Sequence, residues 1–102
     1  MTEHLKHYIG GQYVAGKSGR FSPVYNPSTG EHKADLPLAT EEEVGDAIAD
    51  SLAAFPEWAE TSPITRARVM FKFKQLVEDN IEELAALLSS EHGKVHSDAK
   101  GS

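Results

Sequence analysis

Histidine offers the most chemistry in this sequence, and two of the five histidines lie four positions apart. His92 and His96 have the spacing at which one helix face can present two imidazoles to a metal ion. Gly93 lies between them and is expected to end a helix, because glycine is the usual left-handed C-cap. The spacing reveals no third ligand. We therefore expect no metal site, and we identify no Ser/His/Asp arrangement for nucleophilic catalysis.

Two glycine motifs can be compared with phosphate-binding loops, and both lack the required spacing. Gly10-Gly11 is not followed by a helix start and lacks the G-x-G-x-x-G pattern of dinucleotide sites. Gly93-Lys94 lacks the upstream glycine of a P-loop, and Val95 stands where serine or threonine would bind Mg²⁺. A tight turn and a helix cap are the better interpretations, so the sequence alone assigns no cofactor-binding residue.

Charged residues form two clusters that are more easily explained by structure than by catalysis. Asp46 and Asp50 would share one face of a helix, but no third ligand accompanies them, so a solvated face is the better interpretation. A basic cluster follows later in the chain. Because the net charge is −6 and no other basic stripe is present, we expect this cluster to match the acidic helix before it rather than a nucleic acid. Its members are Arg66, Arg68, Lys72 and Lys74.

The composition limits the function classes further. The 102 residues correspond to one domain at most, and 39% hydrophobic with 25% charged residues is typical of a globular protein rather than a disordered one. No cysteine is present, which excludes disulfides, thiolate metal sites and a cysteine nucleophile within these residues. The first twenty residues contain no leader-like segment, and no apolar run is long enough for a bilayer. We expect a cytoplasmic protein with no membrane or nucleic-acid partner.

The N-terminal third is expected to form strands. Residues 1–6 are interpreted as a loose terminus, and the β-rich runs 7–9 and 12–14 flank Gly10-Gly11, which predicts a tight hairpin. A short extended piece at 23–25 and a strand at 31–36 flank the turn Asn26-Pro27-Ser28-Thr29-Gly30, in which proline fixes φ and glycine takes the left-handed position. Residues 1–36 thus form a first region of two hairpins that requires a packing partner.

Residues 37–102 are expected to be helical, and the first helix begins at a capping box. In Thr40-Glu41-Glu42-Glu43, the threonine hydroxyl and the last glutamate are placed to satisfy each other's backbone amides. Pro56 is expected to end this helix at about Phe55. One face is apolar, and Trp58 is expected to fill the gap before the next helix. The apolar positions are Val44, Ala47, Ile48, Leu52 and Phe55, with Ser51 on the same face.

The second predicted helix, Ser62–Asp79, has an unusually wide apolar surface. Ser62 is a good N-cap and Pro63 a good first residue. One apolar face consists of Val69, Met70, Phe73, Leu76 and Val77, and a second of Ile64, Ala67 and Phe71. A helix that is apolar over most of its circumference is buried on more than one side. We expect one face to close a local core and the other to contact something outside this chain.

The third predicted helix restarts at Asn80 through a second capping pattern, Asn80-Ile81-Glu82-Glu83, and ends at Gly93. Residues 95–102 carry no apolar face of their own, although Ser97 or Asp98 would suit the cap of a further helix. The residues alone therefore predict an α+β chain, with N-terminal β-hairpins followed by three α-helices, and the two regions 1–36 and 37–102 together form one partial domain.

Taken in order, these segments resemble the N-terminal fifth of an aldehyde dehydrogenase. The matching stretches are YIGGQYV, VYNPSTGE, LPLATEEEV, AAFPEW and the long helix that closes on EHGK. Each motif is loose, but their order and spacing are specific, and the resemblance extends from Tyr8 to the last residue. Within that superfamily, RARVMFKFKQL and SSEHGKVHSDAKG are especially similar to the CoA-acylating methylmalonate-semialdehyde dehydrogenases.

The resemblance implies an activity for which this chain lacks the essential residues. It implies NAD-dependent oxidation of malonate or methylmalonate semialdehyde, with attack by a cysteine thiolate, transfer of the acyl group to coenzyme A, and loss of CO₂. It also implies a homo-oligomer and a place on the NAD-binding side of an α/β fold. Because no cysteine and no dinucleotide-binding turn are present, no catalytic, cofactor-binding or metal-binding residue is carried over.

The leading interpretation is thus an N-terminal dehydrogenase fragment that is inactive alone. We expect its partner to be the rest of the dehydrogenase, or a second copy through the helix Ser62–Asp79. The alternative is a stand-alone interaction or oligomerisation module derived from an aldehyde dehydrogenase, in which the same apolar helix binds a groove of another protein. A small independent enzyme is the third interpretation, and it requires a catalytic arrangement that the sequence does not reveal.

Overall fold

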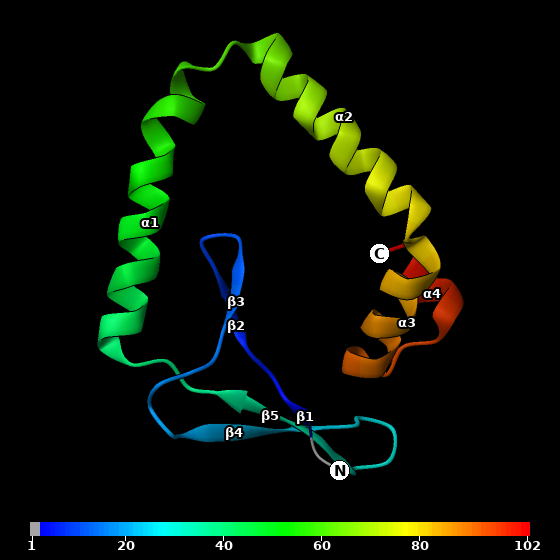
Figure 1. Cartoon of the computed structure of the whole chain (residues 1–102). Coiled ribbons are helices and arrows are strands. Elements are labelled where there is room, and N and C mark those ends of the chain that lie inside the picture. Colours follow the sequence, from blue (N-terminus) through cyan, green and yellow to red (C-terminus); the bar gives the residue numbers. More distant parts are fainter. Residues whose placement is uncertain (1–2) are drawn as a thin grey trace. The chain divides into compact units, whose positions relative to one another are not determined.

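A computed structural model of the chain describes residues 3–102, in which five short strands precede four helices. Figure 1 labels these elements along the chain. The residues divide into two compact units. The first unit combines the chain up to residue 25 with residues 31–60 and contains every strand and the first helix. The second combines residues 26–30 with 61–102 and contains the remaining helices. The α+β class and the three predicted helices are confirmed, and a short fourth helix is added.

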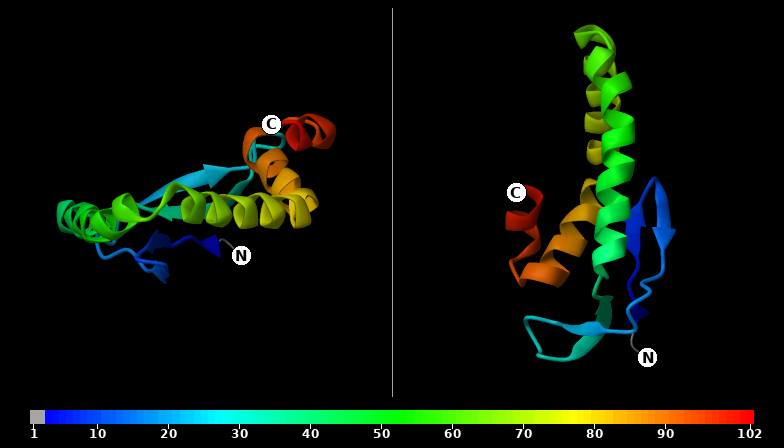
Figure 2. Two further views of the ribbon diagram at one scale, coloured as in Figure 1. Left: turned by 90° about the horizontal axis from the view of Figure 1, so that it is seen from above. Right: turned by 90° about the vertical axis from the view of Figure 1, so that its left-hand side faces the viewer.

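The predicted hairpin at Gly10-Gly11 is present. Strands β2 (His7–Ile9) and β3 (Gln12–Val14) pair antiparallel, and both glycines of the connecting loop have positive φ. Tyr8 opposes Tyr13, with their rings 5.1 Å apart on the outer face. The inner face, which carries His7 and Ile9, lies along α1 (Figures 1 and 2). This face positions the site described below.

A second small sheet corrects one expectation about the N-terminus. Strands β4 (Phe21–Tyr25) and β5 (His32–Pro37) form the predicted second hairpin. Residues 1–2 lie outside the described part, but residues within the supposed loose terminus form β1 (Glu3–His4), which pairs parallel with β5. Strand order is therefore β1-β5-β4. The pairing partner is about thirty residues away in sequence, so no local pattern could indicate it.

Helix α1 (Glu41–Glu60) starts as predicted but continues past the predicted end. The capping box is present, since Glu43 N donates to Thr40 Oγ1 and Thr40 N donates to Glu43 Oε1, each at 3.0 Å. Pro56 lies inside the helix rather than ending it. Proline removes only one backbone hydrogen bond, and its tendency to break helices is overridden here because intact turns flank it on both sides.

Helix α2 (Pro63–Asp79) has the predicted N-cap, because Thr65 N donates to Ser62 Oγ at 3.3 Å. Within the helix, Lys74 pairs with Glu78 at 2.8 Å, and this carboxylate raises the pKa of the Lys74 ammonium. No residue of α2 is buried. Most side chains of the two predicted apolar faces are exposed, whereas Ala67 and Val77 are partly covered. The expectation that one of these faces closes a local core stays a prediction.

The junction at Asn80 corrects a second detail. Asn80 separates α2 from α3 (Ile81–His92), but its side chain does not cap α3. Its amide nitrogen Nδ2 donates 2.7 Å back to the carbonyl of Leu76, so it satisfies the end of α2 instead. The capping-box interpretation fails because the Asn80 amide satisfies a carbonyl at the end of the preceding helix, so its side chain is not available to α3.

The end of α3 is organised by a glycine, as predicted. Gly93 has φ +88° and donates its N–H to the carbonyl of Ser89 at 2.8 Å. A Cβ at this position would lie 3.3 Å from Pro27 Cγ, so the turn Asn26–Gly30 and the end of α3 meet closely within the second unit. Helix α4 (His96–Lys100) follows after three residues.

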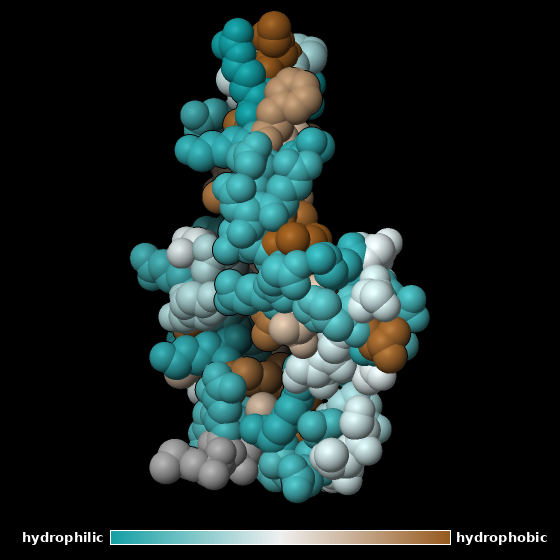
Figure 3. Space-filling view, turned by 90° about the vertical axis from the view of Figure 1, so that its right-hand side faces the viewer, coloured by the Kyte–Doolittle hydropathy of each residue, from teal (hydrophilic) through white to brown (hydrophobic). Residues whose placement is uncertain are grey.

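The core of the described residues is small. The buried apolar side chains are Pro37 and three alanines, Ala34 on β5, Ala85 on α3 and Ala99 on α4, and no large side chain is fully buried. Apolar residues reach the surface in several patches among hydrophilic ones (Figure 3). Most of the large apolar side chains are therefore at least partly exposed. Among the described residues, no helix is long and apolar enough to cross a bilayer.

Candidate functional site: an apolar hollow beside a buried histidine and glutamate

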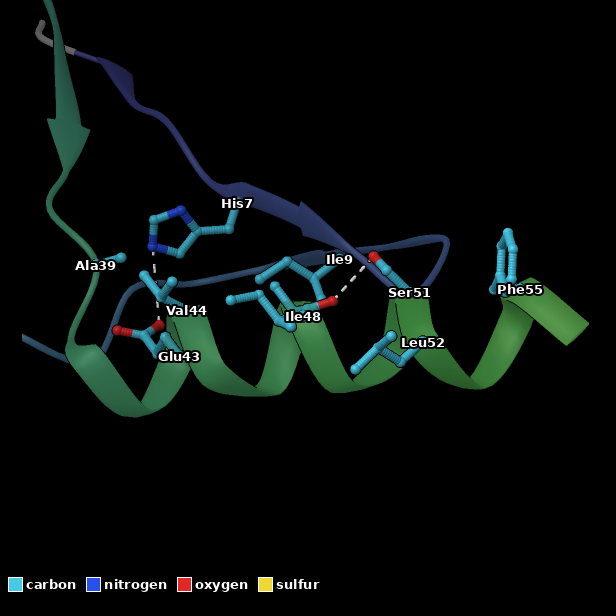
Figure 4. A pocket seen from close by; sticks show the side chains of 10 residues that line it. His7, Ile9, Ala39, Glu43, Val44, Ile48, Ser51, Leu52 and Phe55 are labelled. Carbon is cyan, nitrogen blue, oxygen red and sulfur yellow. Dashed lines mark hydrogen bonds and ion pairs between the residues drawn. The ribbon is translucent and has the colours of Figure 1, made fainter.

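A concave surface of the first unit lies between α1 and strand β2 (Figure 4). It has a volume of about 550 Å³ and is open on one side. Strand β2 contributes its inner face, α1 contributes its apolar stripe, and the segment before α1 contributes one alanine. The lining residues are His7, Ile9, Ala39, Glu43, Val44, Ala47, Ile48, Ser51, Leu52 and Phe55.

Glu43 closes one end of this hollow and joins three segments of the chain. Its Oε1 accepts hydrogen bonds from the backbone N–H groups of Thr40, at 3.0 Å, and Lys17, at 3.3 Å. Its Oε2 lies 3.7 Å from Nε2 of His7 on β2. The capping carboxylate therefore fixes the start of α1, the loop after β3 and strand β2 at one point.

The His7–Glu43 pair is well protected from solvent. The side chains are 17% and 6% exposed, and neither His7 Nε2 nor Glu43 Oε2 has a hydrogen-bond partner. The two atoms face each other rather than the open side of the hollow (Figure 4). A general acid or base must reach a substrate atom at hydrogen-bond distance, and these atoms are not presented for that. The pair acts as an internal tie between β2 and α1.

The environment of Glu43 favours its charged form. The hydrogen bond from the Thr40 backbone amide lowers the pKa of the Glu43 carboxyl below its ordinary value, and burial opposes this effect. The amide of Lys17 and the nearby charge of His7 also lower it. Hydrogen bonds to the ionised form outweigh the desolvation of the carboxylate, so Glu43 stays a carboxylate at neutral pH.

At Gly16, the backbone of the loop after β3 lies close to Pro37 and His7. A Cβ at Gly16 would lie 2.7 Å from Cβ of Pro37 and 3.4 Å from Nε2 of His7. The first distance is shorter than side chains tolerate, and the proline ring cannot rotate away. Glycine at this position thus lets the loop after β3 come close enough for the Lys17 amide to reach Glu43.

The long wall of the hollow is the apolar stripe of α1. Val44, Ile48 and Leu52 follow one another at helical spacing, and their exposed fractions are 49%, 56% and 66%. Phe55 continues the stripe at 64% exposed. The hairpin shelters only the first part of a helix that is about 30 Å long. The stripe is therefore an apolar surface that the hairpin covers only in part.

The structure does not bring His92 and His96 to a shared metal site. His96 lies on α4, where its Nε2 is 2.8 Å from Oε2 of Glu82, and Lys100 donates to the other oxygen of that carboxylate at 2.6 Å. Lys100, and then His96, lower the pKa of Glu82. Within residues 3–102, no group of three histidine, cysteine, aspartate or glutamate side chains could hold a metal ion.

The two glycine motifs occupy structural positions. At the hairpin loop, an Asp50 carboxylate oxygen lies 3.4 Å from where a Cβ of Gly10 would be, and this negative charge would repel a phosphate. Lys94 donates 2.8 Å to Ser102 Oγ. Neither motif therefore provides the amide-lined, positively charged cradle that a dinucleotide requires.

Sequence reasoning missed a second titratable cluster on the strands. Asp35 of β5 lies between two imidazoles: its Oδ2 is 3.4 Å from Nε2 of His4, and its Oδ1 is 2.8 Å from Nε2 of His32. The pairing of His4 with Asp35 follows from the β1–β5 register. Because β1 was not predicted, no sequence signal could have placed His4 beside Asp35.

The His7–Glu43 pair was also missed, although each residue was recognised in its own element. Glu43 was predicted as a capping residue and His7 as part of a strand. Their approach depends on the hairpin lying against α1, which is a tertiary contact. Alternation along β2, which turns His7 and Ile9 to the face opposite Tyr8, is the one signal that could have identified the inward-facing residues.

Comparison with known proteins places these elements in a family. A family described as "Aldehyde dehydrogenase family" matches residues 13–102, which is most of the chain. This chain belongs to the aldehyde dehydrogenase family. This match confirms the resemblance expected from the hairpin, turn and helix motifs. The expected similarity to semialdehyde dehydrogenases within the family is also confirmed.

Curated relatives of this aldehyde dehydrogenase chain include malonate-semialdehyde dehydrogenases from bacilli. Malonate-semialdehyde dehydrogenase 2 of Geobacillus thermodenitrificans is 45% identical over 100 residues, which are 98% of this chain and 21% of the relative. Malonate-semialdehyde dehydrogenase 2 of Bacillus cereus is 44% identical over 97 residues, or 95% of this chain and 20% of the relative. The chain thus spans about a fifth of the length of the curated relatives it matches.

Solved structures give the same result for the fold. The chain superimposes with a TM-score of 0.94 and 50% identity on a protein from Sinorhizobium meliloti described as a methylmalonate-semialdehyde dehydrogenase complexed with NAD. The match covers 99% of this chain and 21% of that one. A methylmalonate-semialdehyde dehydrogenase from Oceanimonas doudoroffii matches with a TM-score of 0.91 and 44% identity, covering 99% and 20%. The described fold is therefore that of one segment of an aldehyde dehydrogenase.

Proposed function

We propose that this chain is the N-terminal segment of an NAD-dependent, CoA-acylating dehydrogenase of malonate or methylmalonate semialdehyde. The observation that carries the proposal is the match of nearly the whole chain, at 45–50% identity, to enzymes with those names. In that reaction the aldehyde is oxidised, hydride passes to NAD, and the acyl group reaches coenzyme A with loss of CO₂. The products are acetyl-CoA or propionyl-CoA.

The residues of this chain contribute architecture to that reaction and no chemical step. The chain contains no cysteine to attack an aldehyde. Among the described residues, the hairpin loop beside Asp50 does not fit a dinucleotide phosphate, so we derive no step through NAD here. The segment instead supplies two capped helices and a hairpin on which other parts of the enzyme pack. We expect residues 1–102 alone to be inactive.

We further propose that the enzyme is a cytoplasmic homo-oligomer and that α2 contributes to association. Most of its apolar residues are exposed, and exposed apolar patches of more than a few hundred Å² are uncommon on monomers. On the isolated chain, Phe71→Glu should weaken concentration-dependent association in sedimentation experiments. Gln75→Glu, in the polar arc of the same helix, should not. A wild-type chain that remains a monomer at high concentration would contradict association through α2.

A chimera tests the proposed activity. Residues 1–102 would replace the matched 100 residues of the Geobacillus thermodenitrificans relative, whose remaining sequence follows unchanged. The chimera should reduce NAD, followed by absorbance of NADH, when given malonate semialdehyde and coenzyme A. The isolated 102 residues should give no NADH and no saturable NAD binding.

The parental Geobacillus enzyme is the matched control for this assay. A chimera that is folded and binds NAD, yet leaves the semialdehyde unchanged, would contradict the proposed function. Turnover by the isolated 102-residue chain would contradict it in another way, because the catalytic groups would then have to lie among these residues.

A further inference from the structure

We infer that Pro23 keeps the outer edge of strand β4 from pairing with the β4 edge of a second copy of this chain. In the sheet order β1-β5-β4, strand β4 pairs with β5 on one side, and within residues 3–102 no strand pairs with its other side. An unpaired edge presents backbone donors and acceptors to any extended segment. The inference goes beyond the proposed function, because it concerns association of the chain and no step of the reaction.

The register of the sheet shows in which direction the backbone groups of β4 point. Leu38 N donates to the carbonyl of Arg20 at 2.9 Å, so these two residues form a hydrogen-bonded pair. Hydrogen-bonded and non-hydrogen-bonded pairs alternate along an antiparallel ladder, so the pair at Ser22 is hydrogen-bonded and the pair of Pro23 with Asp35 is not. The backbone groups of residue 23 therefore point away from β5.

A hydrogen bond on the far side of β5 indicates the same direction independently. Leu5 N donates to the carbonyl of Asp35 at 2.9 Å, so this carbonyl points toward β1 and away from β4. Both members of a non-hydrogen-bonded pair direct their backbone groups outward, so the nitrogen of Pro23 lies on the free edge. Because proline has no N–H, the centre of this five-residue edge lacks a donor.

The other residues of β4 are those of a strand that pairs readily. Its sequence FSPVY contains no charged residue, and Phe21 and Tyr25 are exposed. Short, uncharged segments with high β-propensity are prone to edge-to-edge pairing unless a proline or a charge interrupts them. The register shift at Val24 and Tyr25 leaves residues 21–23 regular. Pro23 is itself exposed, so burial in a core does not explain a proline at this position.

A second copy of the chain is the partner that this proline opposes most strongly. Two β4 edges related by a two-fold axis would pair antiparallel and present the same residues to each other. With the axis at residue 23, the two copies of that residue would form a hydrogen-bonded pair, in which each N–H donates to the carbonyl of the other. Proline removes both of these bonds, whereas pairing with an unrelated strand would lose only one.

Restoring the missing N–H tests the inference. Pro23→Thr and Ser22→Thr would be made in the chain that carries Phe71→Glu, so that association through α2 does not contribute. Both variants introduce threonine, but the N–H of residue 22 is directed to β5 within the sheet. In sedimentation experiments, Pro23→Thr should form dimers at concentrations about tenfold or more below those at which the Phe71→Glu parent does, because two hydrogen bonds are gained per dimer. Ser22→Thr should behave like the parent.

Amide hydrogen exchange locates the contact, because the amides of residues 21 and 23 should exchange more slowly in the dimer than in the monomer. A Pro23→Thr chain that keeps the helical circular dichroism of the parent and associates no more strongly would overturn the inference. Equal association of Ser22→Thr, or dimers without protection at residues 21 and 23, would overturn it as well. If Pro23→Thr loses helical signal, Pro23→Ala supplies the same N–H with a smaller side chain and is judged by the same outcomes.

Discussion

The first turns of α1 and the whole of α2 show two ways in which a helix can be specified. The start of α1 is tied to the strands through Glu43, which accepts from Thr40 and Lys17 and faces His7. Helix α2 has an equally recognisable cap at Ser62, but none of its residues is buried. Both helices begin where the sequence indicates, and Glu43 ties the start of α1 to segments that are distant in the sequence.

This difference shows that the residues that determine where a helix begins and ends are not the residues that bury it. Caps use groups within three or four residues, so a 102-residue segment can supply them itself. Burial needs a second layer of structure, and among the described residues the buried apolar side chains are three alanines and Pro37. In an enzyme about five times longer, that second layer can come from outside the segment.

Removing the carboxylate of Glu43 should have the largest effect on the anchored region. Glu43→Ala leaves the backbone amides of Thr40 and Lys17 without an acceptor and separates β2 from α1, so three segments lose support together. The thermal midpoint and the helical circular dichroism signal of the chain should both fall. Glu42→Ala, in the same turn but exposed, should change them little. Equal losses in the two variants would contradict the role of Glu43.

The same contact gives a pH dependence with a definite sign. The pKa of Glu43 is lowered by folding, so its contribution is present above the ordinary carboxyl value of 4.5 and is lost as the pH falls through the lower folded value. The stability advantage of the wild-type chain over Glu43→Gln should therefore shrink between pH 5 and more acidic conditions. Thermal melts at a series of pH values measure this difference, and a constant difference would contradict it.

Substitution at Gly16 should have the next largest effect. Gly16→Ala places a Cβ 2.7 Å from Pro37 Cβ, and relief of that overlap should cost about 1–3 kcal/mol of unfolding free energy. Gly45→Ala is the matched control, because nothing lies within 4 Å of its Cβ and alanine is favoured in a helix by about 0.5–1 kcal/mol. Denaturant titration should thus show shifts of opposite sign, and stabilisation by Gly16→Ala would refute the close approach.

The cap of α2 should contribute less than the anchor of α1. Ser62→Ala removes the acceptor for the Thr65 amide and should cost about 1 kcal/mol. Ser51→Ala is the comparison within α1, where the hydroxyl only donates back to the carbonyl of Ala47, so it should be neutral or slightly stabilising. Urea titration of both variants measures the contrast, and equal effects would show that Ser62 does not act as a cap.

A substitution on the uncovered surface of α2 should have the smallest effect on the isolated chain. At concentrations at which the isolated chain is a monomer, Phe71→Ser should change the unfolding free energy by less than about 0.5 kcal/mol, because the side chain is exposed. In the chimera the same change should be clearly destabilising, because the phenyl group would then be covered. Denaturant titration of both forms provides the test, and a large loss in the isolated chain would show that α2 is already packed there.

The sequence allowed the local parts of the fold to be predicted. The Gly10-Gly11 hairpin, the capping box at Thr40 and the cap at Gly93 each depend on neighbouring residues, and all three are present. Features that need distant partners were missed: β1 pairs with β5 across about thirty residues. Pro56 was misjudged because a general propensity was overridden by its surroundings.

The candidate site was less predictable than the fold for a related physical reason. Glu43 was recognised as a cap, but its contacts with His7 and Lys17 depend on the hairpin and loop that meet α1. The wide apolar surface of α2 was recognised from its residues, whereas the absence of any buried α2 residue is evident only in the described structure. Local pattern thus identified the surfaces, and tertiary structure showed which of them are covered.

Amide hydrogen exchange in the chimera tests most directly the claim that the segment supplies its own caps while its burial comes from the rest of the dehydrogenase. Peptides from α1 and α2 would be compared between the isolated chain and the chimera. We expect the amides of 63–79 and of the later turns of α1 to exchange about tenfold or more slowly in the chimera, with a smaller change at the Glu43-anchored first turn. Equal exchange of α2 in the two proteins would contradict the account.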